Sequence, residues 1–299
     1  MQKAFECFKQ QTEPLLEQLS KLRGSTVFPL LFHLQVSITP WVISEIYDSL
    51  IKFGSHIDGD ADVIIFSRGG DADTAFHISK MFHKMTKGIL SFIVPRVAAS
   101  AATLLTFGGN KIFMGPPSEL GPIDPQIEVS RNRFVSARSL RESVNFFLGE
   151  IIEHPNLPKS TVEALLERLP LTELVDYDRL LEHTEELAVD LLRLRMVTDE
   201  SKAEQIAKKV VRGFKYHGRS ITVNDALALG LDVKEMPSEQ WNIVWEFSKK
   251  WETMALITAE EGSEILTLRI GNGIAFVPSR KAEEKGEEET PFQTILKKL

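Results

Sequence analysis

Between Ala61 and Gln126, short apolar runs alternate with stretches of helical character. Apolar runs at residues 63–66, 89–94 and 111–114 are typical of buried parallel strands. A helical pattern with one apolar face follows the first run, and a second helix follows the second run. Because a β-α-β-α-β pattern builds a parallel sheet with helices on its faces, this segment predicts an α/β fold.

Further elements flank this segment. A helix is expected over residues 1–23, a strand over residues 26–36, and another helix starting at Thr39-Pro40. Because Pro29 lacks an amide proton, its strand is expected at a sheet edge or at a bulge. After Gln126 the pattern turns helical, and helices are predicted at residues 139–152, 160–168, 171–196, 201–209 and 223–229.

The C-terminal region combines a helix with a hairpin. Residues 237–254 form an amphipathic helix whose three tryptophans have to pack on this chain or on a partner subunit. Residues 264–277 read as a β-hairpin around Gly271-Asn272-Gly273. The predicted division is an N-terminal helix (1–24), a main domain (25–235), a C-terminal helix-plus-hairpin appendage (236–280) and a charged tail (281–299).

The composition narrows the class of protein. The chain has 299 residues, a formal net charge of −7 and a single cysteine, Cys7. The negative charge argues against nucleic-acid binding, and one cysteine excludes an intramolecular disulfide. No apolar run is long enough to span a bilayer, and the first residues do not resemble a signal peptide. We therefore expect a cytoplasmic protein without stable membrane insertion.

Two motifs that can carry chemistry follow neighbouring strands of the predicted sheet. Gly69-Gly70 comes after the first strand, and Ser100-Ala101 comes after the second, where a helix begins. In parallel sheets, ligands bind at the carboxyl ends of the strands. Glycines let the backbone approach a substrate closely and direct amide groups at it. A hydroxyl nucleophile with two amide donors nearby is the minimum that acyl transfer requires.

Each motif also has a simpler interpretation. Gly-Gly after a strand is commonly a turn, and a serine before a helix is commonly an N-cap. Their occurrence in consecutive β-α units is more specific than either motif alone. Nucleotide binding is set aside because neither G-x-G-x-x-G nor G-x-x-x-x-G-K-[ST] is present. His33, His56, His77 and His83 show no ligand spacing with carboxylates or cysteine, so neither a metal site nor a cofactor is expected.

Four blocks of sequence resemble the SppA-like serine dehydrogenase proteinase family, a branch of the Clp protease/crotonase fold. They are Ser67-Arg68-Gly69-Gly70-Asp71, residues 98–104 around Ser100, residues 118–126 (SELGPIDPQ) and residues 217–231. The resemblance covers residues 25–235 of the chain. It implies a Clp/crotonase-like parallel β-α-β spiral with a helical excursion.

The resemblance also implies roles for individual residues. Relatives place their nucleophile at the position of Ser100 and their oxyanion glycines at Gly69 and Gly70. Ala101 then offers a further amide for the oxyanion. The implied reaction is the hydrolysis of peptide bonds. A peptide or protein substrate and a homo-oligomer are implied as well. The candidates for substrate binding in the same blocks are Arg68, Asp71, Gly121 and Pro122.

One departure concerns the general base. Several relatives use a lysine on a helix beyond the third block, and the corresponding position here is Arg141. Arginine stays protonated at ordinary pH, so it cannot accept the serine proton. No histidine lies between Ser100 and His154, which leaves His154 and His217 as candidate bases and Lys159 as a weaker one. Each of the three also reads as an ordinary loop, turn or surface residue.

Three hypotheses follow from the sequence. The first is a serine peptidase with Ser100 as its nucleophile. The second is an inactive oligomeric scaffold of the same fold that binds peptides or partner proteins, with Arg141 in the vacated lysine site. The third, an acyl-CoA hydratase or isomerase of the crotonase branch, ranks last. Those enzymes usually work with carboxylates near the oxyanion glycines, whereas this chain offers a serine.

Overall fold

The computed structural model describes residues 2–130, 133–167, 174–214, 216, 218–257 and 264–279. Its main sheet consists of β1 (Ser25–Phe32), β2 (Asp60–Phe66), β3 (Leu90–Val94), β5 (Lys111–Met114), β9 (Val233–Lys234), β10 (Glu264–Ile270) and β11 (Gly273–Ser279). The strand order is β10-β11-β1-β2-β3-β5-β9, and only the β10–β11 pair runs antiparallel. The predicted α/β class, with a mostly parallel sheet, is confirmed.

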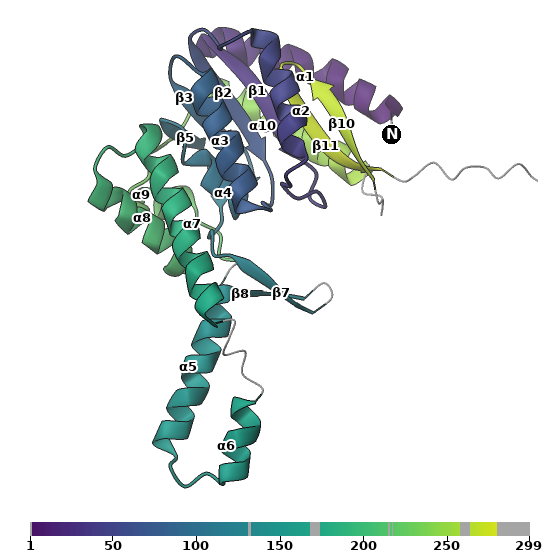
Figure 1. Ribbon diagram of the computed structural model, residues 1–299. Helices are drawn as coiled ribbons and strands as arrows, with labels where there is room; N and C mark the ends of the chain where they lie inside the picture. The colour runs from purple at the N-terminus through teal and green to yellow at the C-terminus, as the bar shows by residue number, and fades with distance from the viewer. Residues whose placement is uncertain are drawn as a thin grey trace, which may run out of the picture.

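Helices cover both faces of this sheet (Figure 1). On one face lie α1 (Gln2–Arg23) and α10 (Ser238–Ile257). On the other lie α2 (Val42–Leu50), the 3-10 turn η1 (Ile51–Phe53), α3 (Ala72–Met85) and α4 (Ala101–Thr106). Beside these pack α7 (Leu174–Arg195), α8 (Glu200–Arg212) and α9 (Val223–Leu229).

Shorter elements branch from this layered body. β4 (Val97–Ala98) pairs with β6 (Glu119–Leu120), and β7 (Gln126–Ser130) pairs with β8 (Arg133–Ser136). α5 (Ala137–Glu153) and α6 (Lys159–Leu166) project away from the sheet, as Figure 1 shows. None of the helices in the described ranges is long and apolar enough to cross a bilayer.

Side chains of the central strands alternate between the two layers. In β2, Val63 and Ile65 join the core under α3, whereas Ile64 and Phe66 join the core under α10. Burial on both faces explains the uninterrupted apolar run that predicted this strand. On the α10 side, Trp251 is fully buried, with ring centroids 5.8 Å from Phe8 and 6.2 Å from Phe66. This tryptophan therefore packs on the chain itself.

The C-terminal hairpin is not a separate appendage. β10 and β11 form where predicted, but β11 pairs in parallel with β1 and extends the main sheet. β1 is therefore an interior strand, and the expectation that Pro29 marks an edge or a bulge is wrong. The proline is accommodated because pairing with β11 begins at Leu30. A Cβ on the neighbouring Gly273 would lie 2.0 Å from the Pro29 carbonyl oxygen, so only glycine fits there.

Two further local expectations are wrong. After Gln126 the chain first forms the β7–β8 hairpin, which the purely helical pattern did not predict. The helix expected to start at Thr39-Pro40 begins at Val42 instead, and the buried Thr39 hydroxyl has no hydrogen-bond partner among the described residues, so it does not cap α2. The later helices α5 to α9 form close to their predicted ranges. The charged tail at 281–299 lies outside the described residues.

A partly buried arginine fixes the end of α7 against α3. The Arg195 Nε donates to His83 Nδ1 at 2.9 Å, and its Nη atoms donate to the carbonyl oxygens of Thr86 and Gly88 at 2.7 and 2.6 Å. Desolvation, followed by the charges of Arg195 and Lys80, lowers the pKa of His83 below its ordinary value of 6.5. The fold therefore favours the neutral imidazole, which accepts from Arg195.

Acidification is expected to weaken this anchor. Because the pKa of His83 is lower in the folded than in the unfolded chain, its contribution is fully present above pH 6.5 and is lost as the pH falls further. The Tm should therefore fall between about pH 7 and about pH 5. His83→Asn, which keeps an acceptor without a titrating ring, should flatten this dependence in thermal unfolding, whereas His56→Asn at an exposed site should not. Equal slopes for wild type and His83→Asn would contradict this role.

Candidate active site

Ser100 sits on a strained turn between β4 and α4. Its backbone has φ 51° and ψ −123°, and it is the only non-glycine residue with positive φ in the described part of the chain. Such a conformation costs on the order of 1–3 kcal/mol, and it recurs where a sharp strand-to-helix turn presents a nucleophile. The hydroxyl makes no cap hydrogen bond to α4 and none to any other described residue. Helix capping therefore does not explain this serine.

Two glycines let the end of β2 approach the Ser100 turn. A Cβ on Gly69 would lie 2.6 Å from the Ala99 carbonyl oxygen and 2.9 Å from the Ser100 Cβ. A Cβ on Gly70 would lie 2.2 Å from the carbonyl oxygen of Ile38, in the loop after β1. Both glycines also have positive φ, 105° and 149°. The Gly-Gly motif is therefore required by close packing on both sides.

The amide groups around Ser100 differ in their hydrogen bonds. The Gly69 N–H donates to the Ser67 hydroxyl oxygen at 3.0 Å, so it is occupied within the chain. The N–H groups of Gly70 and Ala101 have no acceptor among the described residues. Of the amides that the sequence offered as oxyanion donors, these two are therefore free to bind a ligand.

One cleft of about 500 Å³ collects these groups. Its volume lies in the range of sites for small ligands. The predicted site residues that line it are Arg68, Gly69, Gly70, Asp71, Ser100 and Ala101. Its apolar wall includes Leu34, Val36, Leu104, Ile123 and Leu180. Ser100 therefore borders an open cavity with an apolar wall.

The other predicted binding residues have supporting positions. Gly121 and Pro122 are absent from the described cleft lining, although Ile123 of the same block belongs to it. A Cβ on Gly121 would lie 3.0 Å from the Ala99 Cβ and 3.3 Å from the Ser100 nitrogen, so this glycine packs against the Ser100 turn. Asp71 lines the cleft, but its carboxylate caps α3 by accepting from the Thr74 N–H at 2.8 Å.

Backbone pairing and one threonine hold the Ser100 turn. β4 leads into Ser100 and pairs with β6, where Ala98 lies opposite Leu120. The Thr103 hydroxyl oxygen, in α4, accepts from the Gly121 N–H at 3.0 Å, and the hydroxyl donates to the Ala98 carbonyl at 2.7 Å. Because strand, helix and the third sequence block share these bonds, the turn cannot move independently of them.

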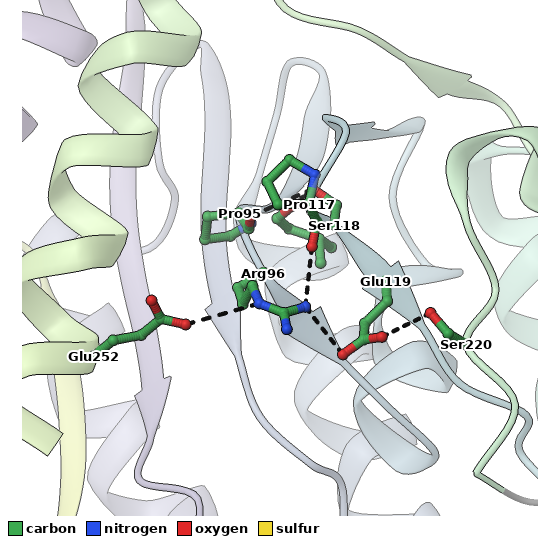
Figure 2. A network of polar contacts seen from close by, with 8 residues as sticks. Pro95, Arg96, Pro117, Ser118, Glu119, Ser220 and Glu252 are labelled. Atoms are coloured by element: carbon green, nitrogen blue, oxygen red, sulfur yellow. Dashed lines mark hydrogen bonds and ion pairs between the residues drawn. The ribbon is translucent and has the colours of Figure 1, made fainter. Parts of the chain in front are cut away.

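A charged network extends this support to α10. Figure 2 shows Arg96 between Glu119 of β6 and Glu252 of α10, at 3.1 and 4.0 Å. The Ser220 hydroxyl donates to the second carboxylate oxygen of Glu119 at 2.7 Å. Leu120 also exchanges two backbone hydrogen bonds with Ile221, at 3.0 and 2.8 Å. The described part of the fourth sequence block therefore contacts the third block, which in turn packs against the Ser100 turn.

The cleft contains a histidine that the sequence analysis missed. His183 of α7 lines the same cavity as Ser100, and its Nε2 lies 2.9 Å from Asp73 Oδ1. With the ring proton on Nε2 donated to Asp73, Nδ1 remains as an acceptor. The sequence pattern predicted only a helix over residues 171–196 and no site residue within it. The sequence did contain a signal for this histidine. His183 and Thr184 follow Leu180 by three and four residues, so they lie on the same helix face and interrupt its apolar positions.

Two of the bases considered from the sequence, His154 and Lys159, do not border the Ser100 cleft. His154 ends α5 with a side chain that is 62% exposed, and Lys159 pairs with Glu163. Arg141 pairs with Asp178 of α7 instead of lining the cleft. His217 lies outside the described residues. His183 is therefore the one histidine in the described lining.

A larger cavity, of about 690 Å³, lies between α1 and α10. The described residues of its lining include Cys7, Trp245 and Lys249 but neither a histidine nor a glycine. Within the described ranges, no group of three or more His, Cys, Asp or Glu side chains could hold a metal ion. We therefore assign the candidate site to the smaller cleft, where a serine hydroxyl, two amides and a histidine occur together, the hydroxyl and the amides having no bonds to described residues.

No family model matches the chain. Two curated proteins of Methanocaldococcus jannaschii are similar to it in sequence. Uncharacterized protein MJ0137 is 28% identical over 240 residues, which span 77% of this chain and 76% of that protein. Uncharacterized protein MJ1495 is 29% identical over 177 residues, which span 59% of this chain and 52% of that protein.

Two solved structures are similar to the chain at a lower sequence identity. Both are mutants of the 1510-N membrane-bound stomatin-specific protease, the second in complex with a substrate peptide. The first is 16% identical, with a TM-score of 0.43, and covers 75% of this chain and 82% of its own. The second is 15% identical, with a TM-score of 0.43, and the match covers 72% of this chain and 76% of the second structure's chain. A likeness this weak does not bear on activity, so the function has to be inferred from the site itself.

Alanine at Gly69 should destabilise the protein more than alanine at Gly24. Gly24 also has positive φ (61°), but a Cβ there would meet nothing within 4 Å. Gly24→Ala should therefore cost about 1–2 kcal/mol of backbone strain alone. Gly69→Ala adds collisions with Ala99 and Ser100. The free energy of unfolding, measured with denaturant, should therefore be lower for Gly69→Ala than for Gly24→Ala. Equal losses would mean that the end of β2 does not press on the Ser100 turn.

Proposed function

We propose that the protein is a serine hydrolase that cleaves peptide bonds through Ser100. The observation that carries this proposal is the strained Ser100 in a cleft that also contains the amides of Gly70 and Ala101, where neither the hydroxyl nor either amide bonds to a described residue. Strain that serves no helix cap is typical of a residue held for chemistry. The choice of a peptide substrate rests on the sequence blocks at 67–71, 98–104 and 118–126, which resemble those of serine peptidases.

In the proposed reaction, the Ser100 Oγ attacks the carbonyl carbon of the scissile bond. His183 Nδ1 accepts the hydroxyl proton, and Asp73 stabilises the imidazolium that results. The carbonyl oxygen becomes an oxyanion, which accepts hydrogen bonds from Gly70 N–H and Ala101 N–H. Collapse of this intermediate transfers the proton from His183 to the leaving amine and leaves an ester on Ser100. Water, activated by the same histidine, then hydrolyses the ester.

Without substrate, Ser100 and His183 do not form a hydrogen bond. The serine hydroxyl has no hydrogen-bond partner among the described residues. Catalytic hydrogen bonds are often long without substrate and tighten in the Michaelis complex. The C-terminal end of α7 is fixed by Arg195, whereas the His183 side chain is 45% exposed. The proposed reaction therefore requires His183 to move toward Ser100 when substrate fills the cleft.

The same observation supports a second candidate function. A serine without a bonded base also fits an inactive scaffold that uses the cleft only to bind peptides or partner proteins. The two candidates differ in the reactivity of Ser100, because an unactivated serine hydroxyl is a weak nucleophile.

Labelling by a fluorophosphonate distinguishes them. We expect the wild type to be labelled once and Ser100→Ala not at all. His183→Gln should react more slowly by about 10²-fold or more, because the proton acceptor is lost. Asp73→Asn should slow labelling less, since the Asp73 carboxylate is largely exposed and screened by solvent.

His56→Gln provides the matched control, since it removes an exposed histidine that lies outside the cleft. Its labelling rate should equal that of the wild type. A folded wild type that resists labelling would favour the scaffold. Labelling that depends on Ser100 but not on His183 would remove His183 from the mechanism.

A further inference from the structure

The cleft contains a guanidinium with no partner in the described structure. Arg68 is exposed, lines the Ser100 cleft and makes no ion pair or hydrogen bond with any described residue. The other charged groups in the lining are engaged. Asp71 accepts from the Thr74 N–H, and Asp73 lies in contact with His183. Arg68 therefore offers all its N–H donors to whatever enters the cleft.

The chain context fixes where such a ligand group would lie. Arg68 directly precedes Gly69-Gly70, and Gly70 carries one of the two free amides. A group bound by Arg68 therefore belongs to the substrate residues next to the carbonyl that Ser100 attacks. The packing of Gly70 against Ile38 and of Gly69 against Ala99 holds this backbone in place.

The chemistry of guanidinium selects the class of group. Its planar fork of N–H donors matches a carboxylate in two parallel hydrogen bonds, which are stronger than bonds between neutral groups. A neutral amide at the same place can fill the fork only in part. A cationic side chain would be repelled by Arg68, although the carboxylates of Asp71 and Asp73 lie on the same cleft.

We propose that Arg68 binds a substrate carboxylate next to the scissile bond, so that the cleft prefers acidic over neutral peptides. This proposal rests on the proposed peptidase function. The carboxylate has two possible sources, an Asp or Glu side chain within a peptide or the free C-terminus of a peptide. Both present the same two oxygens, so experiment has to separate them.

Binding to the Ser100→Ala variant tests the proposal without turnover. The probes are end-capped alanine pentapeptides that carry Asp at each position in turn, with matched Asn and Lys peptides. Penta-alanine with a free carboxylate and its C-terminal amide form a second pair. Calorimetric titration should give about tenfold tighter binding for the Asp peptide over the Asn peptide at one position, or for the free acid over the amide.

Charge-neutral substitutions connect this preference to Arg68. In the Ser100→Ala background, Arg68→Gln should bind the acidic and neutral peptides equally. Arg193→Gln removes an arginine that pairs with Glu200 at 2.9 Å, outside the cleft, and should keep the full preference. The preference should also weaken as salt is added, because an exposed ion pair is screened.

Three results would each overturn the proposal. The first is equal binding of the Asp and Asn peptides together with equal binding of the acid and amide. The others are tighter binding of the Lys peptides and no binding by any probe. Retention of the acidic preference in Arg68→Gln would do the same. Fluorophosphonate labelling of the wild type keeps this outcome separate from the proposed function. Labelled Ser100 without an acidic preference defeats only the carboxylate proposal. An acidic preference that depends on Arg68 in a protein that resists labelling defeats the hydrolase, and leaves Arg68 as a carboxylate-binding group in the cleft of a scaffold.

Discussion

The contact between two turns, at residues 67–71 and 99–101, is the constraint on which the site depends. The turns follow neighbouring strands, and only glycine at position 69 lets them come this close, since a Cβ would strike the Ala99 oxygen and the Ser100 side chain. Ser100 in turn is held at positive φ by bonds from Thr103 and by the β4–β6 pair. The contact brings to one cleft a hydroxyl and two amides that have no bonding partner in the part of the chain that the structure describes.

The layers of the fold make this contact possible. The sheet is buried on both faces, by α1 and α10 on one side and by α2 to α4 on the other (Figure 1). Polar groups are therefore accessible mainly where the strands end, and the turns after β2 and β4 are such places. α7 completes the cleft from a distant part of the sequence, and Arg195 fixes its end against α3. The histidine thus depends on tertiary packing for its position.

The sequence predicted the parts whose cause is local. Apolar runs buried on both faces gave the central strands, and the glycine pair and Ser100 could be singled out because strand ends concentrate function. The interior position of β1 could not be read from Pro29, because it depends on Gly273 far along the chain. His183 was missed for the same kind of reason, since its contact with Asp73 joins two helices that no local pattern relates. Which amide is free also required the structure, because Ser67 occupies the Gly69 N–H.

A crystal structure of the protein after reaction with a fluorophosphonate tests the central claim most directly. The phosphonyl oxygen stands where the oxyanion would form. The account predicts a covalent bond to Ser100 Oγ and hydrogen bonds of about 2.7–3.2 Å from this oxygen to the Gly70 and Ala101 amides. An adduct on another residue, or an oxygen that contacts neither amide in an otherwise unchanged fold, would contradict it.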